Sequence, residues 1–305
     1  MKSGTVINRY VIEKVISDSG GTAVVYLAHL VSNEKFKLAL KIARTDSDNK
    51  AHEDFLLEKE GELLQRWNWR HPGIVRVFPS PYNAGKPQYV MRAVSLPSAP
   101  YFLVMEYLKG ESLGQKLKTI QPYPLEWKIE LFYQILMTVA FIHEKGYAHR
   151  DLKPDNIVFR EPISSTHLPQ PVLVDFALTA KTDDHENYDV IENSLTIHYS
   201  PPERIAKSMG MAMKCDFQSE DVWSLGMIFH EILTGKFMVK GDAEKVKTTI
   251  IRERLEPNLP NTTDYHTLAA YIREMLNPDL EKRPPVELVL KALESKFLPP
   301  RIPSP

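Results

Sequence analysis

The sequence predicts an α+β fold of two lobes, a small antiparallel β-sheet lobe with one main helix and a larger, mainly helical lobe. Three observations support this prediction. Short β-type runs separated by turn residues dominate the chain before residue 110. One charged amphipathic stretch, at residues 50–66, interrupts these runs. Helical periodicity dominates from residue 110 to residue 298, so the sequence divides into lobes at residues 1–109 and 110–298.

The N-terminal lobe begins with three strand-like runs, "YVIEKVI", "AVVYLAHL" and "KLALKIA", which predict an antiparallel meander. Residues 50–66 place Phe55, Leu56, Leu63 and Leu64 on a helix that is otherwise covered with charge. Further strands end in "YFLVMEYL". The segment 79–100 contains five prolines, and we expect it to be a plain surface loop.

The C-terminal lobe begins with a long helix, "LEWKIELFYQILMTVAFIHEKG". Its apolar positions alternate at spacings of three and four, which predicts one buried stripe that ends at Gly146. We expect residues 160–171 to form a second surface loop. The residues of the buried stripe are Ile129, Phe132, Leu136, Val139 and His143. The remaining helices of this lobe are predicted at residues 219–234, 242–254, 264–276 and 286–297.

Bulk properties exclude several classes of protein. The 305 residues have a formal net charge of −1 and 25% charged residues, so no overall basic field favours nucleic acid. Cys215 is the only cysteine, which excludes an internal disulfide framework and a multi-cysteine zinc site. No apolar run approaches the ~20 residues of a membrane span, and the start "MKSGTVINRY" has no signal-peptide core. We expect a cytoplasmic protein. The proline-rich tail 299–305 is either a terminus or the start of a linker, and the sequence leaves open whether a membrane anchor follows it.

The stretch "HRDLKPDN", residues 149–156, follows the long helix and precedes the apolar run "IVF". It resembles the catalytic loop of eukaryotic-like (Hanks-type) serine/threonine protein kinases, and the resemblance extends over roughly residues 8–298. It implies the bilobal protein-kinase fold. In this family Asp151 would accept or orient the proton of the substrate hydroxyl, and Lys153 would neutralise charge on the transferred phosphoryl group. Asn156 would offer an oxygen to a metal ion.

The run "VLVDFALTA" predicts a buried strand that ends at Asp175. It is similar to the Asp-Phe-Gly segment of protein kinases, which makes Asp175 the second expected magnesium ligand, beside Asn156. Ala177 stands where the family has glycine. Because glycine tolerates backbone angles that alanine resists, we expect Ala177 to restrict flipping of this segment.

The segment "LALK" places Lys41 on a strand. Similar kinases use such a lysine to hold the α- and β-phosphates of ATP and pair it with a helix glutamate. Glu58, Glu60 and Glu62 are candidates, and we select Glu60 because "EGELL" places leucines three and four positions after it.

The expected nucleotide site extends along the N-terminal lobe. "YFLVMEYLKGESL" resembles the gatekeeper and hinge of the family, with the Glu106 carbonyl and the Leu108 amide on the adenine edge. The remaining contacts follow from the same alignment. They are Ile16, Ser17, Gly20 and Gly21 in the loop, Val25, Ala39 and Val158 in the apolar walls together with Val174, and Met105 as gatekeeper.

The stretch "ISDSGGTAVVY", residues 16–26, is by itself a weak signal that favours a plain hairpin. Aligned with the family, it places Asp18, Gly20 and Ala23 at the three usual glycine positions of the loop over the phosphates. Only Gly20 is retained, and Gly21 follows it. We therefore expect weakened ATP affinity, partly because Asp18 adds a negative charge near the phosphates.

The stretch "TIHYSPPER" resembles the end of the kinase activation segment. In that alignment Glu203 pairs with Arg283, and Asp221 of "DVWSLG" braces the backbone of the catalytic loop. Thr196, together with Lys153, favours serine/threonine over tyrosine substrates.

The segment between Ala177 and Thr196 is polar and acidic. Arg150 is a candidate ligand for a phosphate placed there. The equally weighted alternative is that the acidic residues already present serve this purpose, or that the loop is simply mobile. The candidate phosphorylation sites are Thr179, Thr182, Tyr188 and Ser194, and Thr196 is included among the regulatory residues.

The first hypothesis is an active serine/threonine protein kinase that uses ATP and Mg²⁺, acts on protein substrates in signalling and phosphorylates itself. The alternative is a pseudokinase scaffold with weak nucleotide binding, which Ala177 and the glycine-poor loop favour. A third possibility, a small-molecule kinase on the same fold, is disfavoured by Lys153 and Thr196. The sequence leaves the oligomeric state open.

Overall fold

The computed structural model describes residues 1–18, 21–44, 50–80, 88–183 and 196–298. It divides into two compact units. Unit 1 comprises Met1–Lys109 and the short segment Val174–Ala177, and unit 2 comprises Gly110–Leu173 and Leu178–Pro305. The first boundary between the units therefore falls between Lys109 and Gly110.

Unit 1 is built on an antiparallel sheet whose six strands, counted over the described residues, have the order β1-β2-β3-β4-β6-β5. Its core includes Tyr10 and Phe102, whose rings meet edge to face at 6.1 Å. The strands are β1 (Val6–Ile7), β2 (Tyr10–Ser17), β3 (Ala23–Leu30), β4 (Asn33–Ala43), β5 (Val90–Arg92) and β6 (Tyr101–Glu106).

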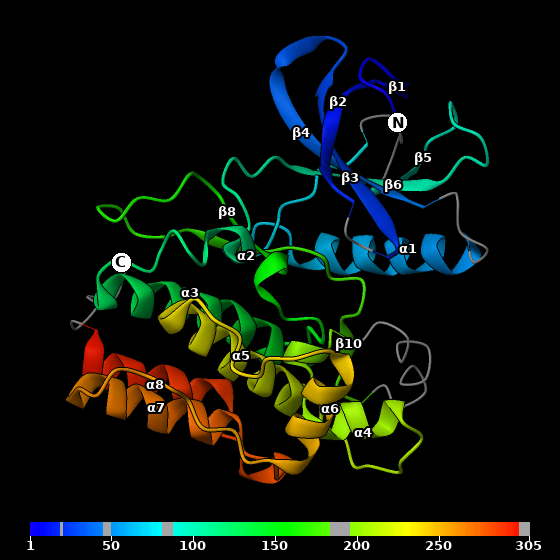
Figure 1. The fold of residues 1–305 in the computed structure, drawn as a ribbon. Helices are drawn as coiled ribbons and strands as arrows, with labels where there is room; N and C mark the ends of the chain where they lie inside the picture. Colours follow the sequence, from blue (N-terminus) through cyan, green and yellow to red (C-terminus); the bar gives the residue numbers. More distant parts are fainter. Residues whose placement is uncertain (19–20, 45–49, 81–87, 184–195, 299–305) are drawn as a thin grey trace. The chain divides into compact units, whose positions relative to one another are not determined.

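One helix, α1 (Lys50–Trp67), packs against β4, β5 and β6 (Figure 1). Leu56, Leu63 and Leu64 are buried, whereas Phe55 is exposed. Gly61 allows the close approach of helix and sheet, because an added Cβ would lie 2.3 Å from Cγ2 of Val90. The helix is thereby held at a fixed distance from the sheet.

Unit 2 is mainly helical, and α3, α5, α7 and α8 lie side by side (Figure 1). The rings of Phe132 and Phe229 stack at 3.9 Å between α3 and α5. All five residues of the predicted stripe on α3 are buried, which confirms that prediction. The helices are α2 (Leu113–Lys116), α3 (Leu125–Glu144), α4 (Pro202–Ser208), α5 (Phe217–Thr234), α6 (Ala243–Arg252), α7 (Thr263–Met275) and α8 (Val286–Phe297).

Short elements connect these helices. β7 pairs with β10, and β8 pairs with β9, both antiparallel. The strands are β7 (Tyr147–Ala148), β8 (Ile157–Phe159), β9 (Pro171–Leu173) and β10 (Ala180–Lys181), and the 3₁₀ turns are Pro154–Asn156, Ile197–Tyr199 and Leu280–Lys282.

The α+β prediction is confirmed, with local differences at the ends of α5, α6 and α7 and in the two expected loops, where Pro171 of the segment 160–171 already belongs to β9. Helix α5 begins at Phe217 rather than at residue 219, because the Asp216 side chain caps it by accepting a hydrogen bond from the Ser219 amide at 2.8 Å. The plain loop expected at 79–100 is wrong in part, since Val90–Arg92 form an edge strand on β6. The prolines of this segment lie outside that strand, so they do not prevent its pairing.

Among the described residues, no helix combines the length and the apolar composition that crossing a membrane requires.

Candidate active site

In unit 1, the buried Lys41 is the centre of a charge cluster with the buried Glu60 and the half-buried Asp175. Its Nζ lies 2.6 Å from Oε2 of Glu60 and 2.8 Å from Oδ1 of Asp175. Glu60 is the glutamate of α1 that contacts this lysine, and its side chain is fully buried. Burial opposes the charge on Lys41, but the attraction of Asp175 and Glu60 outweighs it and raises the pKa of the ammonium group. Lys41 is therefore a fixed cation.

The sheet determines where this cation lies. Lys41 is on β4, which pairs with β3 and with β6, so its backbone is held from both sides. Its register partners are Val25 and Leu103. A lysine on a central strand can move less than one on a loop, which suits a group that must hold a charged ligand in one place.

The segment Val174–Ala177 supplies the second carboxylate of the cluster. Asp175 has φ +64°, which is uncommon for a residue other than glycine. The next amide, that of Phe176, donates to Oε1 of Glu60 at 3.0 Å, and the Phe176 ring meets Trp67 edge to face at 6.0 Å. Glu60 thus binds both Lys41 and the backbone that carries Asp175.

Ala177 has no positive φ in this arrangement and is buried. The left-handed residue of the segment is Asp175 instead. The alanine therefore adopts its conformation here without the strain that a glycine-only geometry would impose. Its predicted effect on flipping stays a prediction.

The other predicted nucleotide contacts are spread over several strands and the segments that follow them. Ala39 pairs with Met105, which is buried. The Glu106 amide donates to the Arg76 carbonyl, and its carboxylate accepts from the Arg76 amide. The remaining positions differ in exposure: Ile16 and Gly21 are exposed, whereas Ser17, Val25, Leu108 and Val158 are half-buried. Val158 belongs to unit 2. Gly20 lies outside the described residues.

Asp18 has a partner that the sequence analysis did not identify. Its carboxylate lies 2.5 Å from Nη2 of Arg44, and the same nitrogen donates to the Asp18 carbonyl at 2.9 Å. Arg44 directly follows β4, so nothing in the spacing of the two residues predicts this pair. The negative charge that we expected near the phosphates is therefore partly neutralised.

In unit 2, three side chains bind the carboxylate of Asp151. Lys153 Nζ and Asn156 Nδ2 donate to Oδ2 at 2.7 and 2.9 Å. The Thr196 hydroxyl donates to Oδ1 at 3.2 Å. Asn156 Nδ2 also donates to the Asp151 carbonyl at 2.9 Å, which fixes the loop between them. The structure thus brings the four predicted residues together around one carboxylate.

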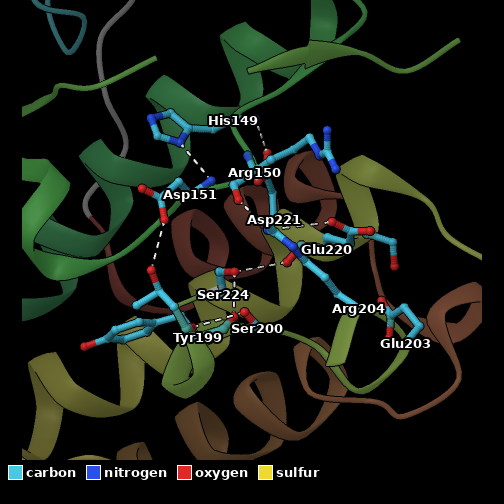
Figure 2. Close-up of polar contacts among 12 residues, drawn as sticks. His149, Arg150, Asp151, Tyr199, Ser200, Glu203, Arg204, Glu220, Asp221 and Ser224 are labelled. Atoms are coloured by element: carbon cyan, nitrogen blue, oxygen red, sulfur yellow. Dashed lines mark hydrogen bonds and ion pairs between the residues drawn. The ribbon is translucent and has the colours of Figure 1, made fainter. Parts of the chain in front are cut away.

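Asp221 holds the backbone that leads to this carboxylate (Figure 2). Its side chain accepts hydrogen bonds from the His149 amide at 2.7 Å and from the Arg150 amide at 2.8 Å. His143 lies 2.9 Å away through Nε2. Burial would raise the pKa of Asp221, but the hydrogen bond and charge of His143 outweigh it and lower the pKa. His143 was predicted only as a core residue.

Glu203 and Arg283 form a buried bidentate pair. Nη1 and Nη2 of Arg283 donate to the two carboxylate oxygens at 2.7 and 2.8 Å. Arg283 Nη1 also donates to the Ser219 carbonyl at 3.1 Å. Helix α4 is thereby bound to the start of α5 and to the chain before α8.

The predicted regulatory residues fall in different surroundings. Arg150 is buried, with its guanidinium carbon 4.0 Å from the centre of the Phe217 ring. Thr179 is buried and donates to the His149 carbonyl at 3.4 Å, whereas Thr182 is exposed and donates to the Gly146 carbonyl. Tyr188 and Ser194 lie outside the described residues. Their regulatory roles stay predictions.

Comparison with known proteins agrees with this arrangement. The family model of the protein kinase domain matches residues 10–298. The chain is 29% identical to the serine/threonine-protein kinase PrkC of Bacillus subtilis over 239 residues, 77% of this chain and 32% of PrkC. It is 27% identical to the serine/threonine-protein kinase pkn2 of Myxococcus xanthus over 270 residues, 87% of this chain and 30% of pkn2. The chain thus spans about a third of these relatives, and it belongs to the protein kinase family.

Proposed function

We propose that the chain is an active serine/threonine protein kinase domain that transfers the γ-phosphoryl group of ATP to hydroxyl groups of protein substrates. The observation that carries this proposal is the group around Asp151, to which Lys153, Asn156 and Thr196 donate hydrogen bonds. The names of the bacterial relatives support the same activity.

The proposed reaction is a direct transfer. The substrate hydroxyl oxygen attacks the γ-phosphorus, the bond from phosphorus to the β,γ-bridging oxygen breaks, and ADP leaves with that electron pair. Asp151 takes the hydroxyl proton. Lys153 stabilises the negative charge on the transferred group, and its contact with Asp151 keeps its ammonium group beside the base.

Each unit, taken by itself, carries groups that suit this reaction. In unit 1, Lys41 offers a permanent positive charge to the phosphates of ATP, and Glu60 keeps that charge in place. In unit 2, Asp151 and Lys153 serve the acceptor and the transferred group. Most of the rate enhancement would then come from positioning and electrostatics.

The side chains also suit magnesium, which prefers oxygen ligands and needs few from the protein when phosphates are present. Asn156 uses its amide nitrogen on Asp151, so the amide oxygen is the atom that it can offer. Asp175 offers a carboxylate. We propose these two residues as the ligands, and the ion would neutralise phosphate charge.

Replacement of the base tests this function. With labelled ATP, Mg²⁺ and a generic acceptor protein, we expect Asp151→Asn to lower transfer by about 10²-fold or more, since general-base catalysis contributes at least that much. Phosphoamino-acid analysis of the wild-type product should show phosphoserine and phosphothreonine.

Asp264→Asn is the matched control, because Asp264 is an exposed carboxylate on α7. It should transfer label at the wild-type rate. The proposal fails if folded wild-type protein that binds ATP transfers no more label than Asp151→Asn.

A further inference from the structure

The peptide that leads into Asp151 has an unusual backbone. Arg150 has φ +66°, a left-handed conformation that is strained for a residue with a Cβ. Such a conformation persists only where surrounding groups hold it. The hydrogen bonds on both sides of Arg150 therefore decide where the next residue, Asp151, lies.

Asp221 holds only one side of this residue. It accepts from the amide of Arg150, whereas the carbonyl of Arg150 belongs to the following peptide group. That carbonyl accepts a hydrogen bond from Nη1 of Arg204 at 2.5 Å. Because a peptide unit is planar, fixing the Arg150 carbonyl also fixes the N–H and Cα of Asp151.

Arg204 is itself well placed to act as a support. It lies on α4, and only 12% of its side chain is exposed. Its Nη1 also lies 4.0 Å from Oε2 of Glu220, a buried carboxylate in the first turn of α5. In Figure 2 the Arg204 side chain extends from α4 toward Arg150 and Glu220. One guanidinium thus connects two helices to the strained peptide.

We propose that Arg204 is a positioning residue for phosphoryl transfer, which orients the peptide between Arg150 and Asp151 through its hydrogen bond to the Arg150 carbonyl. This inference rests on the proposed kinase function. Arg204 acts through the backbone of the base rather than on the substrate. Loss of its charge should therefore slow the chemical step and leave ATP binding unchanged.

The test compares Arg204→Met, Arg204→Lys and the control Arg273→Met in the whole chain. Arg273 forms an exposed ion pair with Glu256 on the surface of unit 2. We expect single-turnover transfer by Arg204→Met to fall about tenfold, while the Kd for ATP stays within about twofold of wild type. Arg204→Lys, which keeps the charge and one nitrogen that donates hydrogen bonds, should recover most of the rate.

A second readout does not depend on activity. Amide hydrogen exchange of residues 149–151, measured without nucleotide, should be faster in Arg204→Met than in Arg273→Met, because the hydrogen bonds of this segment then open more often. If Arg204→Met does not fold, Arg204→Gln and Arg273→Gln serve for the same comparison.

A transfer rate of Arg204→Met within twofold of the rate of Arg273→Met would overturn the inference. This holds even if the melting temperature of Arg204→Met fell, because Arg204 would then serve stability alone. If the wild-type protein transfers no phosphate, the proposed function fails and hydrogen exchange alone decides the inference. Unchanged exchange in residues 149–151 would then overturn it, and faster exchange would support it.

Discussion

Asp18 occupies a position at which similar kinases carry glycine, and Arg44 binds its carboxylate. The ion pair is exposed, with 61% of the Asp18 side chain open to solvent, so its contribution to stability is small. Its effect on a charged ligand is a separate matter. Without the Asp18 carboxylate, the positive charge of Arg44 would no longer be neutralised and would attract the phosphates of ATP.

We therefore expect Asp18→Asn to lower the KM for ATP by about two- to fivefold, which corresponds to up to ~1 kcal/mol of charge interaction. Asp18→Gly should lower it at least as far, because it also restores the backbone freedom of the loop. Steady-state kinetics at varied ATP concentration measure both effects. Glu34→Gln, an exposed acid on β4, is the control, and an unchanged or higher KM in both Asp18 variants would contradict this account.

The effect expected of Ala177 depends on its backbone conformation, which the residue type alone does not give. The alanine suggested a restrained segment because the family has glycine there. In the structure the positive φ belongs to Asp175, two positions earlier, and Ala177 is an ordinary buried alanine. The departure from the family therefore carries no strain in this conformation.

At the scale of elements, an ion pair and a hydrogen bond from a charged guanidinium connect α4 to the rest of unit 2. Glu203 binds Arg283, and Arg204 binds the Arg150 carbonyl. Adjacent residues of one short helix thus connect it to two parts of unit 2. The seven residues of α4 alone would not form a stable helix in water, so these contacts are needed to keep it folded.

Arg283→Met should lower the free energy of unfolding by about 3–5 kcal/mol, because it leaves the buried Glu203 carboxylate without its cation. The double variant Glu203→Leu with Arg283→Met should lose less, since no buried charge then remains. Urea denaturation followed by circular dichroism measures both. Arg273→Met is the exposed control, and an equal loss in Arg283→Met and this control would show that the pair contributes nothing.

At the scale of the whole molecule, two adjacent residues of α5 make stability depend on pH in opposite directions. Burial lowers the pKa of His230 to about 4, and burial raises the pKa of Glu231 to about 7. Because the unfolded chain binds the His230 proton more strongly, with a pKa of ~6.5, His230 lowers the free energy of unfolding as pH falls from 6.5 toward 4. Above pH 6.5 the histidine is neutral in both states and this loss is absent. For Glu231 the folded chain binds the proton more strongly than the unfolded chain, whose pKa is ~4.5. Below pH 4.5 the full contribution to the free energy of unfolding is present, and it is lost as pH rises through 7.

His230→Phe should isolate the first effect. The stability of the wild type relative to this variant should fall by about 2 kcal/mol between pH 7.5 and pH 5, since the unfolded chain binds the proton more strongly than the folded chain. Urea unfolding at both pH values gives this difference. A difference that does not change with pH would mean that His230 titrates equally in both states.

The sequence predicted that the residues around Asp151 lie together because three of them are close in the chain, and their catalytic roles stay a proposal. "HRDLKPDN" contains Asp151, Lys153 and Asn156 within six positions, and the hydrogen bonds of Asp151 to the other two are local. Contacts over long sequence distances were harder to predict. The Asp18–Arg44 pair and the contact of Arg204 with Arg150 depend on where separate elements meet, which no spacing in a single sequence reveals.

The strand at Val90–Arg92 was missed for a similar reason. Three residues are too short for a clear alternation of apolar and polar side chains, and the prolines of the segment suggested a loop. What makes these residues a strand is the exposed edge of β6. The predicted pair of Glu203 with Arg283 required the family alignment, since 79 residues separate the two in the chain.

The four residues Val174–Ala177 belong to unit 1, although the chain on both sides of them belongs to unit 2. Neither unit is therefore a continuous stretch of chain. A fragment that ends at Lys109 would contain Lys41 and Glu60 but would lack Asp175 and the Phe176 amide that binds Glu60. The charge cluster of unit 1 therefore stays incomplete in any fragment of this sequence that ends before Phe176, even if the strands and α1 of that unit are all present.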